Sequence, residues 1–120
     1  MVQEPAALDQ VFHALSDPTR RAMLASLTDA ERNIGELAAP HAMSFAAASK
    51  HVRVLESAGL LRRRVEGRVH LCRIVAEPLA AAQAWLQVYE TLWTNSFEAL
   101  DALLKAEDAA ALQARKDPTP

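Results

Sequence analysis

Residues 50–73 carry seven basic side chains and only two acidic ones. The basic residues are Lys50, Arg53, Arg62, Arg63, Arg64, Arg68 and Arg73. Ammonium and guanidinium groups that share one face bind the phosphates of a polyanion, even when the whole protein is nearly neutral. The local charge is +5, whereas the whole chain has a formal net charge of −2, so the flanks are acidic. A charge run alone is also compatible with a solvated surface, so the elements that carry it decide its meaning.

The residues around the start of this basic segment predict a helix over 44–57. Ser44 is a typical N-cap, and the apolar residues Ala48, Val52 and Leu55 recur at helical spacing. Gly59 follows Ala58 as the expected C-cap glycine.

A two-stranded hairpin is predicted directly after this helix. Residues 60–65 and 68–74 interleave apolar residues with arginines, and Gly67 supplies the positive φ of the turn between them. Successive side chains of a strand point to opposite faces, so at most one of Arg62 and Arg63 serves a given surface.

Helices are also predicted over 8–15, 18–27, 34–39 and 77–107. Ser16 or Asp17 caps the second, and Pro18 suits its first turn. The fold class is therefore mainly α with a small β-hairpin wing, in the order of a winged helix-turn-helix. Residues 1–107 are expected to form this domain with N- and C-terminal dimerisation helices, and residues 108–120 a flexible tail.

The last helix has two apolar stripes. A domain of this size seldom covers both, so we expect one stripe to dock on the domain and the other to meet a second copy, with the first helix contributing. Packing of the whole helix within the monomer is the alternative. Which stripe forms the interface stays open. The expected interface residues are Leu8, Val11, Phe12, Trp85, Tyr89, Leu92, Trp93, Phe97 and Leu100.

Four segments resemble the ArsR/SmtB-type bacterial repressors. They are LSDPTRRAML at 15–24, IGELA at 34–38, MSFAAASKHVRVLESAGLL at 43–61 and EGR at 66–68. The resemblance spans residues 8–104. It implies a homodimeric repressor that binds an inverted repeat in double-stranded DNA and often acts on its own operon.

The N-terminal part of the second helix of a helix-turn-helix lies nearest the bases. Ser49 and Lys50 are expected to donate to bases or phosphates, and Arg53 to phosphates. Phe45 either contacts thymine methyls or packs under the turn. The expected DNA-binding set is Ser44, Phe45, Ala46, Ala47, Ser49, Lys50, His51, Arg53, Arg64, Gly67 and Arg68.

Two kinds of residue in or near this set have an alternative role. Packing and capping are favoured over base contact for His51. Arg20 and Arg21 either pair with Asp17 or another acid to hold the helices together, which is favoured, or contact phosphates.

Metal sensing is not expected. Many members of the family that the chain resembles bind metals through cysteines in the third helix, at positions that are Asn33 and Gly35 here. Others use Asp and His pairs in the last helix, which contains no histidine in this chain. The chain therefore looks like a non-metal-sensing branch without a cofactor. A new site using His13 or His41 lacks the paired spacing of metal ligands. Cys72, the single cysteine, is expected to pack rather than to be redox-active.

The sequence does not indicate an enzyme, because it has no glycine-rich phosphate loop and no nucleophile beside a base. A winged-helix module that binds protein instead of DNA is the alternative function, and the joint basic charge of helix and hairpin favours DNA. No signal peptide or apolar span is evident, so we expect a cytoplasmic protein without a membrane partner. The operator and any small-molecule effector are not identified by the sequence.

Overall fold

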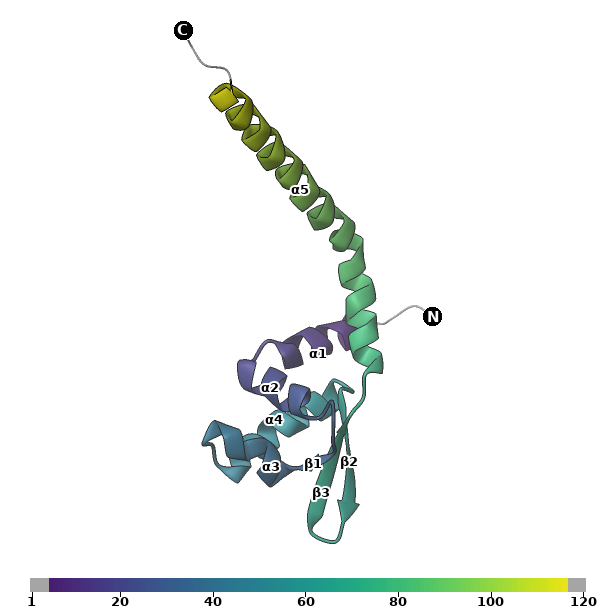
Figure 1. Cartoon of the computed structure of the whole chain (residues 1–120). Helices are drawn as coiled ribbons and strands as arrows, with labels where there is room; N and C mark the ends of the chain where they lie inside the picture. The colour runs from purple at the N-terminus through teal and green to yellow at the C-terminus, as the bar shows by residue number, and fades with distance from the viewer. Residues whose placement is uncertain (1–4, 117–120) are drawn as a thin grey trace. The chain divides into compact units, whose positions relative to one another are not determined.

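The computed structural model describes residues 5–116, which form two compact units that divide between Gln83 and Ala84 (Figure 1). The elements, in order, are α1 (Pro5–Leu15), α2 (Pro18–Ser26), β1 (Arg32–Asn33), α3 (Ile34–Ala38), the 3-10 turn η1 (Ala39–His41), α4 (Phe45–Ser57), β2 (Leu61–Glu66), β3 (Val69–Ile74) and α5 (Glu77–Lys116). The predicted fold class, a mainly helical winged helix-turn-helix, is confirmed.

The core of the first unit gathers apolar side chains from α1 to the start of α5. Met23, Leu37, Leu55 and Leu60 are each at most 1% exposed, and no polar or charged residue among those described is buried. Burying one large apolar side chain contributes about 1.5–3 kcal/mol, so these residues dominate the stability of the unit.

Local capping sets the starts of α2 and α3, and the cap of α2 is one of the two residues that the sequence predicts. The Asp17 carboxylate accepts a hydrogen bond from the Arg20 amide at 3.0 Å, with Pro18 in the first turn of α2. Asn33 and Glu36 form a reciprocal capping box at α3, which satisfies two amides that the helix leaves free. The turn before α4 places Ala42 in the left-handed region at φ 49°.

The three strands form an antiparallel sheet in the order β1-β3-β2. Leu61 lies opposite Ile74 at the base of the hairpin, and Glu66 lies opposite Val69 beside the turn. Strand β1, whose Arg32 and Asn33 pair with Cys72 and Leu71, is absent from the elements predicted above. A two-residue strand has no periodicity to detect, and it forms because the free edge of β3 offers it unpaired backbone groups.

The last helix is longer than expected. Its first turns belong to the first unit, where Ala82 is 5% exposed and Leu79 packs against the core. The expected end at Glu107 is wrong, because α5 continues to Lys116 and residues 108–116 of the expected tail are helical. Alanine makes up four of the nine residues 108–116 and favours helix. Residues 117–120 lie outside the described part.

No helix within residues 5–116 is both long enough and apolar enough to span a lipid bilayer.

Candidate nucleic-acid interface

The start of α4 presents small and basic side chains to solvent. The Ser44 hydroxyl accepts a hydrogen bond from the Ala47 amide at 3.1 Å, which confirms Ser44 as the N-cap. Ala48, Val52 and Leu55 are fully buried and fix which face of α4 points inward. Of the expected contact residues on this helix, Phe45, Ala46, Lys50 and Arg53 are exposed, whereas Ala47, Ser49 and His51 are half-buried.

Phe45 joins this helix face to the hairpin. Its side chain is 63% exposed, so it does not pack under the turn. It lines a depression of about 230 Å³ together with Asn33, Ile34, Gly35, Arg68, Val69 and His70. The first residue of α4 and the tip of the hairpin therefore share one continuous surface.

The turn of the hairpin depends on Gly67, whose φ is 62° with open space around it. Arg68 follows on the exposed tip and makes no ion pair with any residue that the structure describes. Arg64 differs, because its guanidinium binds Glu31 at 3.0 Å and Glu66 at 3.2 Å. Its charge is thus largely matched within the protein, which the sequence could not reveal because Glu31 is 33 residues away.

A second arginine of β2 ties the hairpin to α4. Arg63 donates to both carboxylate oxygens of Glu56, from Nε at 3.0 Å and from Nη2 at 3.1 Å. Its Nη1 lies 3.3 Å from Nδ1 of His70 on β3. Two parallel charge-assisted hydrogen bonds fix direction as well as distance, so this ion pair sets the angle between hairpin and helix.

Arg62 and Arg73 lie directly opposite each other on the other face of the hairpin. Both are exposed, and neither forms an ion pair with another described residue. Like charges at opposed positions destabilise strand pairing. This pair therefore leaves two guanidinium groups without an ion-pair partner on the hairpin face that also carries Arg64.

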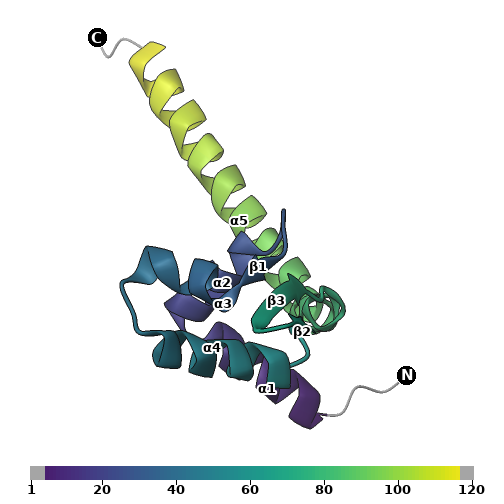
Figure 2. The same ribbon diagram turned by 90° about the horizontal axis from the view of Figure 1, so that it is seen from below.

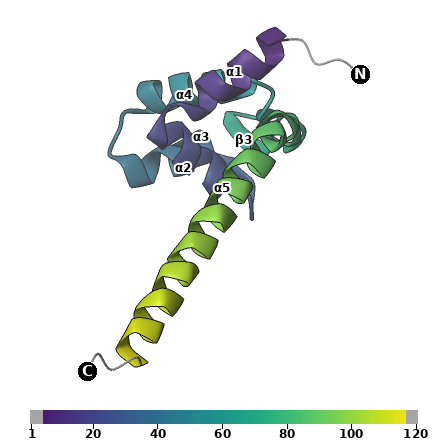
Figure 3. The same ribbon diagram turned by 90° about the horizontal axis from the view of Figure 1, so that it is seen from above.

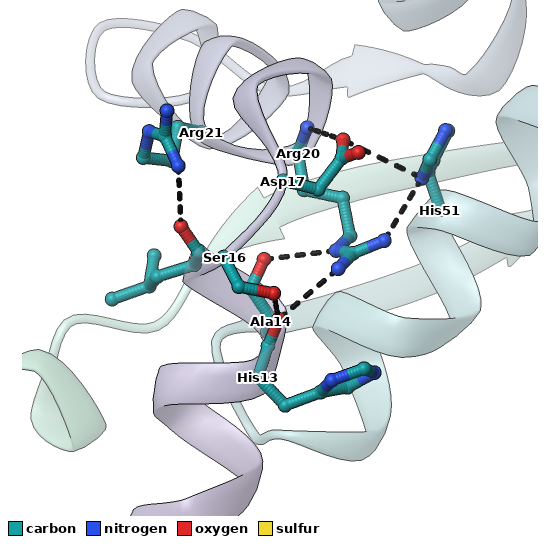
Figure 4. A network of polar contacts seen from close by, with 8 residues as sticks. His13, Ala14, Ser16, Asp17, Arg20, Arg21 and His51 are labelled. Atoms are coloured by element: carbon teal, nitrogen blue, oxygen red, sulfur yellow. Dashed lines mark hydrogen bonds and ion pairs between the residues drawn. The ribbon is translucent and has the colours of Figure 1, made fainter.

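Arg20 lies at the centre of a network between α1, α2 and α4 (Figure 4). Its Nε donates to the Ala14 carbonyl at 2.8 Å and its Nη2 to the His13 carbonyl at 3.0 Å. Its Nη1 lies 3.3 Å from Nδ1 of His51, which is itself 4.0 Å from the Asp17 carboxylate. His51 thus contacts Arg20 and Asp17 at the start of α2, which agrees with the packing role that the sequence favours.

Arg21 satisfies the same helix end, since its Nη1 donates to the Leu15 carbonyl at 2.7 Å. Both arginines therefore hold the helices together, through carbonyls in the last turn of α1 more than through an acid. A cation at a helix C-terminus is favourable, and this offsets their unfavourable place in the first turn of α2. The Arg20 amide hydrogen bond and then the charges of Arg20 and His51 lower the pKa of Asp17 below its ordinary value.

Asn33, one of the two positions where the family resemblance implies thiols, has another role here. Asn33 caps α3, and no three ligating side chains within residues 5–116 converge as a metal site. Cys72 is 0% exposed in the middle strand, and burial raises the pKa of its thiol. A buried, protonated thiol is a packing residue rather than a nucleophile.

The described part of α5 from Ala84 onward exposes its apolar side chains within its own unit. Val88, Leu92 and Phe97 are each at least 67% exposed, and the ring centroids of Trp85 and Tyr89 lie 5.1 Å apart. The expected interface residues on α1 differ among themselves. Leu8 and Phe12 are half-buried, whereas Val11 is 3% exposed in the core and has no surface to offer a second copy.

Comparisons with known proteins agree with this architecture. Residues 15–64 match a family described as a helix-turn-helix domain. The HTH-type transcriptional regulator Rv2034 of Mycobacterium tuberculosis is 31% identical over 82% of this chain and 90% of its own length.

Solved structures give the same result. The ArsR family transcriptional regulator RHA00566 is 41% identical, with a TM-score of 0.72 over 78% of this chain and 97% of that one. The Mb0332 domain of Mycobacterium bovis, a possible ArsR-family regulator described as a homodimeric winged helix-turn-helix DNA-binding domain, is 33% identical, with a TM-score of 0.55 over 74% of this chain and 88% of that one. The chain belongs to the ArsR family of winged helix-turn-helix transcriptional regulators, which are not enzymes.

Proposed function

We propose that this regulator is a homodimeric repressor that binds an inverted repeat in double-stranded DNA. Two α4 helices related by a two-fold axis would enter successive major grooves about one helical turn apart. Repression follows from steric exclusion of polymerase at the bound site. A winged module that binds only protein is the competing function, and the shared basic surface of helix and hairpin favours DNA.

The observation that carries this proposal is the continuous surface that joins the start of α4 to the hairpin tip. Phe45 and Arg68 line one depression, while Lys50 and Arg53 stand exposed further along α4. Lys50 and Arg53 make no ion pair with a described residue, so their charge is available to phosphates. A helix for the major groove and a basic wing for the adjacent groove are thus presented together.

The proposed contacts differ in strength. Lys50, Arg53 and Arg68 supply the main positive charge, with Ser44, Phe45, Ala46, Ala47, Ser49 and Gly67 close to the bases and backbone. Arg64 contributes less, because Glu31 and Glu66 already bind it. His51 positions α4 through Arg20 rather than reading bases.

The exposed apolar side chains of α5 support the proposal that the protein forms a homodimer. Six large apolar residues that are each at least 44% exposed are unusual on a monomer and mark an interaction surface. The homodimeric description of the related Mycobacterium bovis domain supports the same assembly. We propose that these six, Trp85, Tyr89, Leu92, Trp93, Phe97 and Leu100, meet a second copy, with Leu8 and Phe12 contributing.

Selection of bound sequences from random DNA identifies the operator, and an inverted repeat is expected. Fluorescence anisotropy on that operator then compares Lys50→Ala and Arg68→Ala with Lys105→Ala, which removes an equal charge from an exposed site on α5. Removal of one phosphate contact is expected to lower affinity about tenfold and to reduce the salt slope by about one. Unchanged affinity in both variants at moderate salt contradicts the proposed DNA face.

Two further measurements test the remaining parts. Sedimentation is expected to show a dimer at micromolar concentration, and a stable monomer contradicts the α5 interface. Repeating the DNA measurement with Zn(II) and with a chelator tests whether a metal controls binding, and equal affinity is expected because no ligand cluster is formed within residues 5–116.

A further inference from the structure

A groove between α1 and α4 shares Lys50 and Arg53 with the proposed DNA contacts, and its other lining residues have no part in them. Figures 2 and 3 show the two helices side by side within the first unit. The groove has a volume of about 690 Å³, within the range of small-molecule sites. It is lined by Asp9, Gln10, His13, Lys50, Arg53, Val54, Ser57 and Ala58.

Its lining combines an apolar floor with a cationic rim. Val54 and Ala58 form the floor, and the methylene stems of Lys50 and Arg53 extend it. The ends of these two side chains carry positive charge that no described residue pairs. Such a lining fits a molecule with one anionic group and one apolar body.

Two other lining residues refine this chemistry. The His13 ring points away from the Arg20 network, toward which its own carbonyl is directed (Figure 4). Asp9 is the one carboxylate of the lining, and it forms no ion pair with Lys50 or Arg53 among the described residues. Lys50, Arg53 and Asp9 together give the lining a net charge of +1, which favours a monoanion over a polyanion.

We infer that this groove binds a small amphipathic organic acid and that its occupation opposes DNA binding. This effect of the ligand on DNA binding rests on the proposed function, because Lys50 and Arg53 belong both to the groove and to the proposed phosphate contacts. A carboxylate that binds these two cations neutralises the charge on which the phosphates depend. The ligand thus competes for shared side chains and needs no change of fold.

An NMR titration of the full chain with 2-naphthoate tests the site without DNA. Backbone amides of the lining residues are expected to shift and saturate at submillimolar concentration. Binding should be about tenfold weaker for 2-naphthalenemethanol, which lacks the charge, and for inorganic phosphate, which lacks the apolar body. Equal binding of either probe, or shifts confined to residues 84–114 of α5, overturns the inference.

Variants separate the groove from the DNA face. Ser57→Trp fills the groove and should abolish the shifts, while Ala25→Trp on the exposed side of α2 should retain them. Asp9→Asn removes the opposing carboxylate and should tighten 2-naphthoate about threefold. Retained binding in Ser57→Trp, or weaker binding in Asp9→Asn, contradicts the assignment.

The coupling is measured on the selected operator. Saturating 2-naphthoate should weaken DNA binding about tenfold in the native chain and in Ala25→Trp, and leave Ser57→Trp unchanged. Undiminished DNA affinity in the presence of bound ligand overturns the competition. If the native chain binds no DNA at all, the proposed function fails, and the NMR titration still decides whether the site exists.

Discussion

Arg63 on β2 and Glu56 on α4 form a bidentate ion pair, with both nitrogen to oxygen distances between 3.0 and 3.1 Å. The pair joins the end of α4 to strand β2 of the hairpin. Its side chains are 20% and 37% exposed, so solvent screens the pair only in part. One ion pair between two elements thereby fixes how both would meet DNA.

Loss of this ion pair should lower both stability and DNA affinity. Arg63→Ala is expected to reduce the free energy of unfolding by about 1 kcal/mol, and Arg63→Lys should recover little because an ammonium cannot form the parallel pair. Chemical denaturation of the single variants, Glu56→Ala and the double variant gives the interaction energy. A value near zero in that cycle contradicts a directional role for the pair.

Substitutions of Ser44 test two things separately, the stabilising effect of the N-cap of α4 and the distance of this position from DNA. Ser44→Ala removes the acceptor for the Ala47 amide and should cost about 1 kcal/mol in the free energy of unfolding. Ser44→Asp keeps the cap, and its carboxylate should weaken operator binding by repelling phosphate. Ala25→Asp adds the same charge on α2 and serves as the control. Equal loss of affinity in Ser44→Asp and Ala25→Asp would show that Ser44 lies away from the DNA.

Arg20 and Arg21 should differ in their effect on folding. Arg20→Ala removes the guanidinium donors of the Ala14 and His13 carbonyls, of which His13 keeps the Ser16 hydroxyl, and the contact with His51, so the expected cost is about 2 kcal/mol. Arg21→Ala removes one exposed hydrogen bond and should cost about 0.5 kcal/mol. Thermal unfolding of both variants checks this order. A larger loss of stability in Arg21→Ala than in Arg20→Ala would contradict the central role of Arg20 in joining α1 to α2.

Asp17 should make the free energy of unfolding depend on pH in the acidic range. Its folded pKa is lowered, chiefly by the Arg20 amide, so its contribution is complete above the unfolded pKa of about 4 and is lost as pH falls through the folded value. Asp17→Asn keeps a neutral cap that does not titrate. The stability difference between native chain and variant should be constant above about pH 5 and shrink below about pH 4. A difference that grows on acidification contradicts this assignment.

Local signals in the sequence were sufficient for most of the fold. Ser44, Gly59 and Gly67 mark a helix start, a helix end and a strand turn through their own conformational preferences, and the structure has φ 76° and 62° at the two glycines. The sequence does not predict the short strand β1, because this strand depends on an edge supplied by β3. The predicted end of α5 is too early, since an alanine-rich polar segment is typical of a tail and also forms helix.

The candidate site was less predictable because its contacts are distant in the chain. Arg63, Arg64 and Arg68 are equivalent by residue type, yet only Arg68 lacks a carboxylate partner among the described residues. Glu31 and Glu56 determine this difference, and they lie on other parts of the fold. Periodicity indicates which face a side chain occupies and does not indicate which acid lies beside it.

The opposed arginines Arg62 and Arg73 should make the pairing of β2 with β3 depend on ionic strength. Their mutual repulsion weakens the pairing of β2 with β3, and added salt screens it. The same salt weakens the attraction between a basic surface and phosphate. Rising salt should therefore relieve the repulsion between these two arginines under the same conditions in which the proposed DNA contacts weaken.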